Sequence, residues 1–176
     1  MSEPTPSRNF RGAAVLRDPL VQELLGKRLV GVLATIEHDG SVHAVPLWLA
    51  LGDDAILVAT GSPSRKVRNL ERDPRATLVL HDSRPGAEVC GVSLRGRVEI
   101  VRGAAAVPLV AQVHRRYVAE AGLRLPEVAA FLGGDDVALR FLPEAAVTWD
   151  ERGSDAARVL REAGAALALE PTAPRS

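Results

Sequence analysis

Short apolar segments separated by tight turns are the feature that most constrains the fold of this chain. Leu29–Ile36 is followed by the turn Glu37–Gly40, in which Asp-Gly supplies the positive φ angles of a hairpin. The chain returns through Ser41–Leu51, turns again at Gly52–Asp54 and continues through Ala55–Thr60. Apolar runs of this length, bounded by such turn residues, predict β-strands.

The rest of the chain adds strands and helices to this pattern. Further strands are predicted over Ala76–Asp82, Val89–Val101, Asp136–Leu142 and Ala145–Trp149, with Ser83–Ala87 as a loop. Helices are predicted over Pro19–Gly26, Ser64–Arg72, Ala104–Ala121, Leu125–Leu132 and Ser154–Ala166. Asp18 is the expected N-cap of the first helix, and Pro19 its first residue. Many short strands joined mostly by tight turns predict an antiparallel barrel or sandwich that is mainly β, with flanking helices.

Length and composition favour one domain with a sizeable core. The chain has 176 residues, with 22 Lys and Arg against 22 Asp and Glu, so no overall charge points to nucleic acid. No apolar run reaches the roughly 20 residues of a membrane span, and residues 1–10 lack the apolar core of a signal peptide. The single cysteine, Cys90, excludes an internal disulfide and a cysteine-based metal cluster. A cytoplasmic location with no nucleic-acid or membrane partner is expected.

The chain divides into four parts on this pattern. Residues 1–14 are expected to be a flexible N-terminus, and residues 15–152 to form the barrel domain. Residues 153–169 are expected to carry a C-terminal helix, and residues 170–176 to be a disordered tail.

The segment Thr60–Leu70 carries the clearest functional signal. Small polar residues end a strand there, and Arg65, Lys66 and Arg68 then fall in the first turns of a helix. Cations are unusual at a helix N-terminus, where the dipole is already positive. Free N–H groups, hydroxyls and cations together suit a phosphate. The alternative is a solvated basic helix whose arginines pair with Glu71 and Asp73.

An ordered set of motifs resembles the pyridoxamine-5′-phosphate-oxidase-like split β-barrel proteins. The motifs are Gly31–Gly40, Val45–Trp48, Ser64–Arg75 and Gly96–Ile100, and the similarity extends over residues 20–150. The branch that is most similar contains oxidoreductases dependent on a deazaflavin, coenzyme F420. The resemblance implies an FMN-binding type of split antiparallel β-barrel that forms a homodimer with two cofactor clefts at its interface.

The resemblance also implies where a cofactor lies. The phosphate-bearing arm is expected at the turn and helix Thr60–Arg68, with Lys66 as the main phosphate ligand, and the ring along the strand Ser41–Leu51. Relatives often carry a second cation where this chain has Ser64, a role that Arg65 could take over. The candidate cofactor-binding residues are Val45, Pro46, Trp48, Thr60, Ser62, Ser64, Arg65, Lys66 and Arg68.

Other residues leave alternatives open. Trp48 either stacks near a ring or fills a dimer core. Pro46 lacks an N–H group, so its strand is expected to be unpaired or irregular there. His81 and His114 have no partner at a metal-ligand spacing, so no metal site is expected. Tyr117 on its helix either approaches a substrate or packs in the core or at its rim.

The catalytic chemistry is expected to come from a cofactor, because no catalytic triad, carboxylate pair or P-loop is present. No catalytic residue is therefore predicted. The favoured hypothesis is an enzyme that uses reduced F420 to transfer hydride to a small unsaturated molecule. The alternatives are an FMN-dependent oxidoreductase and a non-catalytic protein that binds flavin, deazaflavin or haem. Pyridoxamine-phosphate oxidase activity itself is least favoured, because Ala145–Ser176 lacks the expected basic signature for the substrate phosphate.

The arginines of the predicted helix give a further hypothesis. Arg65, Arg68 and Arg72 share a helix face, and Arg75 follows them. This basic strip could follow the anionic tail of a deazaflavin. Alternatively, Arg68 and Arg72 pair with neighbouring acids, namely Glu71, Asp73 or Asp82, and contact no ligand.

Overall fold

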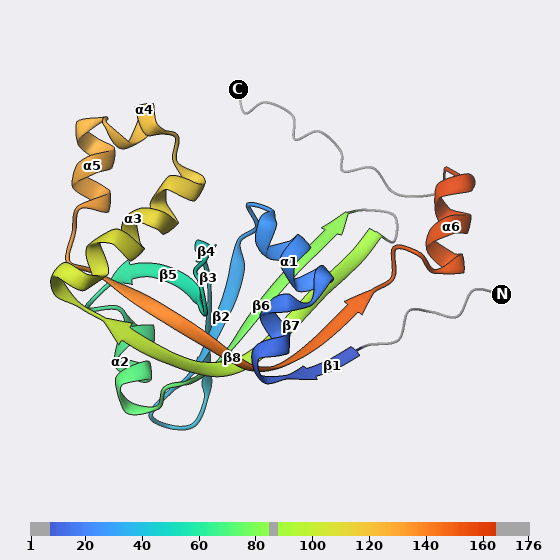
Figure 1. The fold of residues 1–176 in the computed structure, drawn as a ribbon, viewed down its shortest axis with the longest axis horizontal. Coiled ribbons are helices and arrows are strands. Elements are labelled where there is room, and N and C mark those ends of the chain that lie inside the picture. Colours follow the sequence, from blue (N-terminus) through green and yellow to red (C-terminus); the bar gives the residue numbers. More distant parts are fainter. Residues whose placement is uncertain (1–7, 85–87, 165–176) are drawn as a thin grey trace.

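The computed structural model describes residues 8–84 and 88–164, which form a strongly curved sheet with helices along it (Figure 1). The strands are β1 (Arg8–Arg11), β2 (Gly31–Ile36), β3 (Val42–Leu47), β4 (Leu49–Leu51), β5 (Ile56–Gly61), β6 (Arg75–Arg84), β7 (Glu88–Val101) and β8 (Asp136–Asp150). The α-helices are α1 (Pro19–Gly26), α2 (Arg65–Arg72), α3 (Ala106–Tyr117), α4 (Glu120–Leu123), α5 (Pro126–Leu132) and α6 (Asp155–Glu162). Two 3₁₀ helices, η1 (Gly12–Arg17) and η2 (Gly103–Ala105), precede α1 and α3.

The sheet is a split antiparallel barrel, as the sequence predicts. Its strand order is β3-β2-β6-β7-β8-β5-β4, with β1 on β8, and the paired strands are antiparallel. The strands β3 and β4 stand at the two ends of this order, yet Trp48 alone separates them in the chain. The chain itself therefore joins the two edges and curls the sheet into a barrel.

The strand predicted over Ser41–Leu51 is divided at Trp48, because its two halves pair with different neighbours. The first half, β3, pairs with β2, and the second half, β4, pairs with β5. The prediction that the strand is unpaired or irregular at Pro46 is wrong at that position, since Pro46 lies opposite Val32 in an unbroken register. Among the described residues β3 has β2 as its only neighbour, and an edge strand tolerates a missing N–H group.

The two strands predicted over Asp136–Leu142 and Ala145–Trp149 are one strand, β8. The pairing of β8 with β7 shifts register between Arg95 and Gly96, opposite Pro143. A side chain at Gly96 would collide with the carbonyl oxygen of Leu142, so the close approach of the two strands there requires glycine. The bulge lets β8 continue through a proline that cannot donate a ladder hydrogen bond.

The ends of the chain differ from the sequence prediction. Residues 8–11 were expected to be flexible but form β1, which pairs with β8, and residues 12–17 form η1. The C-terminal helix α6 is shorter than the predicted Ser154–Ala166. The tail at 170–176 and the loop residues 85–87 lie outside the described residues. The single helix predicted over Ala104–Ala121 begins as the 3₁₀ helix η2 and continues as α3, and extended backbone at Val118 separates α3 from α4.

The apolar run at the barrel junction is buried largely by its own chain. Leu47, Leu49 and Ala50 are all at most 9% exposed. Leu47 and Leu49 join the main core with residues such as Phe141, and Ala50 packs in a smaller cluster with Leu57 and Val113. The abundance of apolar residues in this strand therefore does not by itself require a second copy of the chain. At this junction the side chain of Trp48 stays 37% exposed, and Val42, at the other end of β3, is 67% exposed.

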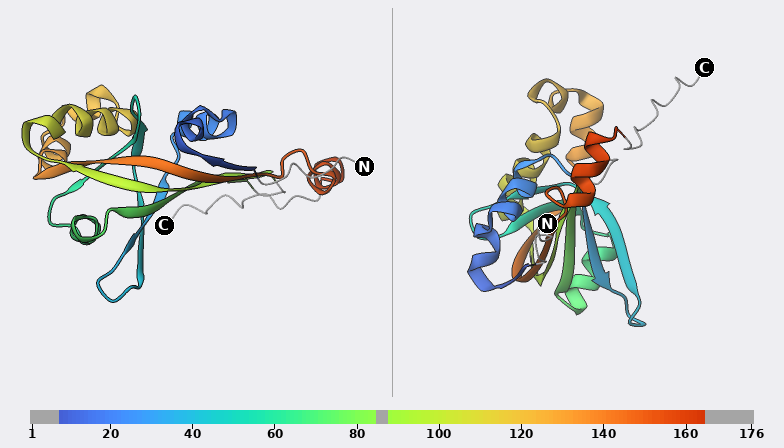
Figure 2. Two further views of the ribbon diagram at one scale, coloured as in Figure 1. Left: turned by 60° about the horizontal axis from the view of Figure 1, so that its bottom comes forward. Right: turned by 90° about the vertical axis from the view of Figure 1, so that its right-hand side faces the viewer.

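The helices are distributed unevenly around the barrel. The three helices α3, α4 and α5 gather at one end of the sheet, α1 lies beside it and α6 stands at the other end (Figure 1). The β2–β3 hairpin projects away from α3, α4 and α5 (Figure 2). The first helix begins as predicted, with Asp18 Oδ1 accepting hydrogen bonds from the N–H groups of Leu20 at 3.0 Å and Val21 at 3.2 Å.

Candidate functional site

A cavity of about 520 Å³ lies where β3, β5, α2, α3, α5 and the start of β8 meet, and we call it the Lys66 cavity. Its lining residues are Pro46, Leu47, Trp48, Ala59, Thr60, Gly61, Lys66, Val113, His114, Phe131, Leu132 and Asp136. The wall is mainly apolar, with a few polar groups at one side. This size and composition are typical of a site for a small organic ligand.

Lys66 is the cation of this cavity. Its half-buried ammonium group donates a hydrogen bond of 2.8 Å to the hydroxyl of Thr60. Among the described residues it makes no ion pair, and burial lowers its pKa, an effect that the charge of Asp136 partly offsets. An ammonium group has three donors, so Lys66 retains capacity for an anionic ligand.

The start of α2 supplies further donors beside Lys66. Ser64 is the N-cap residue, but its side chain makes no capping hydrogen bond, and its Oγ lies 3.5 Å from Thr60 Oγ1. The backbone N–H groups of Arg65 and Lys66 have no acceptor among the described residues. Such groups, together with the positive end of the helix dipole, attract anions. The donors present here fit a phosphate group.

Asp136 and His114 supply an acidic group and a basic group to the cavity wall. His114 Nε2 lies 3.8 Å from Asp136 Oδ2, and both side chains are largely buried. Burial lowers the pKa of His114 and raises the pKa of Asp136, which in each case favours the uncharged form. The pair therefore places one titratable base and one titratable acid at the cavity wall.

Trp48 is held by its own chain at the mouth of the cavity. Its ring stacks on Tyr117, with centroids 4.9 Å apart and planes at 5°. Tyr117 is fixed in turn, because its hydroxyl donates to the carbonyl of Leu29 at 2.6 Å and accepts from the N–H of Leu49 at 3.3 Å. Tyr117 thus packs against Trp48 and covers one indole face, while Trp48 remains 37% exposed.

The predicted cofactor-binding residues fall into two groups. Pro46, Trp48, Thr60 and Lys66 line the Lys66 cavity, and Ser64 contacts Thr60 at its edge. The remaining four, Val45, Ser62, Arg65 and Arg68, are not among its lining residues.

The remaining predicted residues have other contacts. The hydroxyl of Ser62 donates to the carboxylate of Asp135, and its N–H donates to the Asp135 carbonyl at 2.8 Å. Arg65 and Arg68 line a second, polar cavity of about 600 Å³, the arginine groove. The residues of this groove are Glu37, His38, Asp39, Ser41, Val42, His43, Arg65, Arg68, Asn69 and Arg72.

In the part of the chain that the structure describes, no ion pair joins an arginine of α2 to the acids considered from the sequence, although the charge of Arg72 helps to lower the pKa of Asp73. Arg68 donates to the carbonyl of Pro63, and Arg72 donates to the carbonyl of Ile36. Arg65 lies 3.7 Å from Glu37 Oε1. The three acids have other partners, since Glu71 pairs with Arg102, Asp73 with Arg75 and Asp82 with Lys27.

The far wall of the Lys66 cavity is the part that the sequence reasoning missed. Val113 and His114 come from α3, Phe131 and Leu132 from α5, and Asp136 from the first position of β8. One available signal was that His114 stands in the apolar stripe of the predicted helix Ala104–Ala121. A buried histidine in such a stripe requires a polar partner, which the structure identifies as Asp136.

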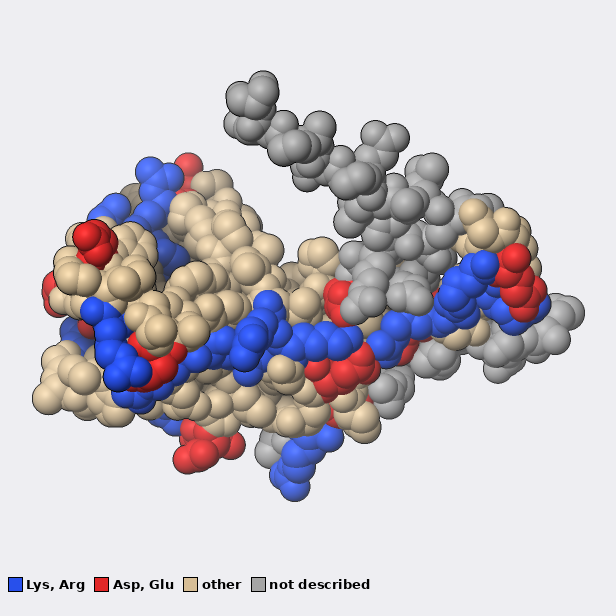
Figure 3. Space-filling model, turned by 90° about the horizontal axis from the view of Figure 1, so that it is seen from above, with Lys and Arg blue, Asp and Glu red and all other residues tan. Residues whose placement is uncertain are grey.

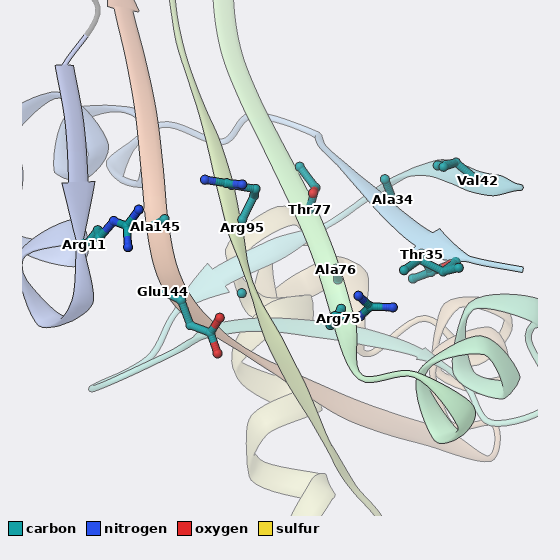
Figure 4. Close-up of a pocket in the computed structure, with 12 residues that line it drawn as sticks. Arg11, Ala34, Thr35, Val42, Arg75, Ala76, Thr77, Arg95, Glu144 and Ala145 are labelled. Carbon is teal, nitrogen blue, oxygen red and sulfur yellow. The ribbon is translucent and has the colours of Figure 1, made fainter. Parts of the chain in front are cut away.

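A third cavity, of about 600 Å³, lies on one face of the sheet, and we call it the sheet cavity. Its lining residues belong to β1, β2, β3, β6, β7 and β8, and Figure 4 labels most of them. The lining residues are Arg11, Ala34, Thr35, Ile36, Val42, Arg75, Ala76, Thr77, Arg95, Gly96, Glu144 and Ala145. This open face mixes apolar groups with three arginines and one carboxylate.

The surface carries both signs of charge. On the face in Figure 3, Lys and Arg side chains form a row, and Asp and Glu side chains lie beside it at several points. Ion pairs such as Arg140 with Asp54 and Arg152 with Asp150 show the same alternation. Among the described residues, no three His, Cys, Asp or Glu side chains are grouped to hold a metal ion.

None of the helices in the described part of the chain has both the length and the apolar character needed to cross a membrane.

The chain is similar to known proteins over most of its length. A family model described as pyridoxamine 5′-phosphate oxidase matches residues 18–150. A conserved hypothetical protein, Rv2991 from Mycobacterium tuberculosis, is 28% identical with a TM-score of 0.65, over 81% of this chain and 91% of that one. A protein titled F420 reductase is 26% identical with a TM-score of 0.57, over 71% of this chain and 94% of that one.

A protein whose title refers to haem shares the fold as well. HutZ from Vibrio cholerae, titled a heme storage protein, has a TM-score of 0.59 over 74% of this chain and 94% of that one. Its identity is 17%, so this likeness concerns the fold alone. No curated protein matches the sequence.

Proposed function

The chain belongs to the pyridoxamine 5′-phosphate oxidase family, and on this premise we propose that it is an oxidoreductase using reduced coenzyme F420 to transfer hydride to a small unsaturated molecule. The observation that carries the proposal is Lys66, an ammonium group without an ion pair among the described residues, at the open start of α2 and beside an apolar cavity. The likeness to a protein titled F420 reductase supports the choice of cofactor.

Different residues of the Lys66 cavity would bind different parts of the cofactor. Lys66, the Thr60 hydroxyl and the first N–H groups of α2 would hold the phosphate. Trp48 and Phe131 would provide apolar walls that exclude water from the reacting atoms. The bound deazaflavin would supply the hydride. His114 and Asp136 would hold the exchangeable protons at the cavity wall.

A titration of the protein with F420 and with FMN, each at low and high salt, tests this proposal. We expect F420 to bind more tightly than FMN and to lose affinity with salt. Its tail carries several anionic groups, and Arg65, Arg68 and Arg72 line a groove along the same helix as Lys66. Tighter binding of FMN, without a salt effect for either cofactor, would contradict the choice of F420 and favour an FMN-dependent enzyme.

Turnover distinguishes an enzyme from a carrier. Reduced F420 is expected to be oxidised in the presence of at least one compound from a panel of enones and quinones. A protein that binds reduced F420 but never oxidises it across such a panel would instead be a non-catalytic carrier of flavin, deazaflavin or haem.

We also propose that the chain forms a homodimer through the open sheet face and the neighbouring Trp48 edge. The sheet cavity and the exposed side chain of Val42, at 67%, lie on this face. Sedimentation velocity at micromolar concentration is expected to show a dimer, and Val42→Lys to weaken it, because the lysine charge would be buried. Val107→Lys, at a position 64% exposed on α3, is the matched control. A wild-type chain that sediments as a stable monomer would contradict the proposal.

A further inference from the structure

The Lys66 cavity contains a carboxylate as well as an ammonium group. Asp136 lines the same cavity as Lys66, and its side chain is 21% exposed. Its Oδ1 lies 3.9 Å from the point that a Cβ atom would occupy on Gly61, so the carboxylate stands against the turn that leads into α2. An anion bound at the start of α2 therefore interacts with both charges.

The other charged groups near this turn do not change the net charge that lines the Lys66 cavity. Arg65 and Arg68 line the arginine groove, where Arg65 approaches Glu37 and Arg68 donates to the carbonyl of Pro63. Asp135 is engaged with Ser62. His114 is the titratable group next to Asp136; burial lowers its pKa, which favours the neutral imidazole, and the positive charge of Lys66 opposes the rise that burial causes in the pKa of Asp136. Among the described residues that line the cavity, Lys66 and Asp136 carry the formal charges, one positive and one negative, which sum to zero.

A site without net charge does not offset the cost of burying a doubly charged ligand. The desolvation cost of an ion rises about with the square of its charge, whereas its attraction to Lys66 rises only in proportion to that charge. A phosphate monoester carries about −1.5 to −2 charges at pH 7, and a phosphodiester carries one. The singly charged group is therefore the better match for this cavity.

We infer that Asp136 makes the Lys66 cavity selective for a cofactor whose phosphate is a singly charged diester, against one that ends in a phosphate monoester. This inference rests on the proposed function, because it assumes that a phosphate binds at Lys66. F420, whose phosphate is a diester, meets the requirement, and FMN, a monoester, does not. Asp136 acts here as a determinant of specificity through its charge.

Two ligands that differ only in phosphate charge test the inference, namely FMN and its monomethyl phosphate ester. Their binding at pH 7.5 is measured from the quenching of flavin fluorescence, with wild type and Asp136→Asn. Wild type is expected to bind the methyl ester about tenfold more tightly than FMN. Asp136→Asn is expected to increase the affinity for both ligands. The increase for FMN should be about the square of the increase for the methyl ester, because the repulsion that is removed scales with the charge of the ligand.

Two further variants keep the test independent of one substitution. Asp53→Asn makes the same chemical change at an exposed turn at the far end of β5, and the preference should stay as in wild type. Ser64→Arg adds a cation at a position whose side chain makes no capping bond, and it should shift the preference toward FMN. Circular dichroism establishes that each variant is folded.

The outcomes separate this inference from the proposed function. Equal binding of the two ligands by wild type, or a preference that neither Asp136→Asn nor Ser64→Arg changes, would overturn the role of Asp136 alone. Loss of all flavin binding in wild type, or binding that Lys66→Ala leaves intact, would overturn the phosphate site and, with it, the inference.

Discussion

Lys66→Ala is expected to weaken the binding of F420 by about 1.5–3 kcal/mol, which is about 10- to 150-fold in affinity. Among the described residues that line the Lys66 cavity, Lys66 is the only Lys or Arg, so the substitution removes this cation and with it a charge-assisted hydrogen bond to phosphate. The free energy of unfolding should change little, because the lost hydrogen bond to Thr60 is balanced by relief of a half-buried charge. Titration calorimetry measures the affinity, and urea unfolding measures the stability.

The matched control for Lys66→Ala removes a cation elsewhere. Arg28 is exposed and lines none of the three cavities described above, so Arg28→Ala should leave the affinity within about twofold of wild type. Equal affinities in wild type and Lys66→Ala would mean that the phosphate lies away from the start of α2.

Phe141→Ala is expected to lower the free energy of unfolding by about 3–5 kcal/mol. Phe141 is fully buried in the middle of β8, opposite Ile56 on β5 and Val98 on β7. Its removal leaves a cavity where these three neighbouring strands pair inside the sheet, and the strands on both sides limit collapse around it. Urea unfolding at a single protein concentration measures the change, because a dimer would make the midpoint depend on concentration.

The control for the core substitution is the same change on the surface. Phe131 is 83% exposed, so Phe131→Ala should alter the free energy of unfolding by at most about 0.5 kcal/mol. A loss of less than about 1 kcal/mol for Phe141→Ala would show that β8 does not form the centre of the core.

Local signals in the sequence predicted most of the strands and turns. The hairpin turn at Glu37–Gly40 carries its own conformational signal, and Gly40 has the expected positive φ of 84°. The N-cap at Asp18 is equally local. These features depend on residues only a few positions apart, so one sequence suffices to predict them.

The predictions that were wrong concern features that depend on pairing between segments far apart in the sequence. The break at Trp48 follows from two different partner strands, and the continuity of β8 through Pro143 depends on a bulge in its pairing with β7. The strand β1 exists because β8 offers it an edge, and the polar sequence near the N-terminus does not indicate that pairing.

The candidate site likewise combines a part that local sequence predicts with a part that depends on tertiary packing. The wall from Thr60 to Lys66 is a strand, a turn and a helix start in succession, and the sequence predicted it. The opposite wall is brought to it by tertiary packing of α3, α5 and β8, which places His114 beside Asp136 although 22 positions separate them. No sequence spacing specifies such a pair.

A crystal structure of the chain with bound F420 decides whether the Lys66 cavity is the cofactor site. We expect a phosphate oxygen about 2.7–2.9 Å from Lys66 Nζ, with other oxygens accepting from the first N–H groups of α2. The ring system is expected to lie in the cavity near Pro46 and Trp48. Electron density for the phosphate in the sheet cavity or in the arginine groove, with Lys66 still bonded only to Thr60, would contradict the assignment.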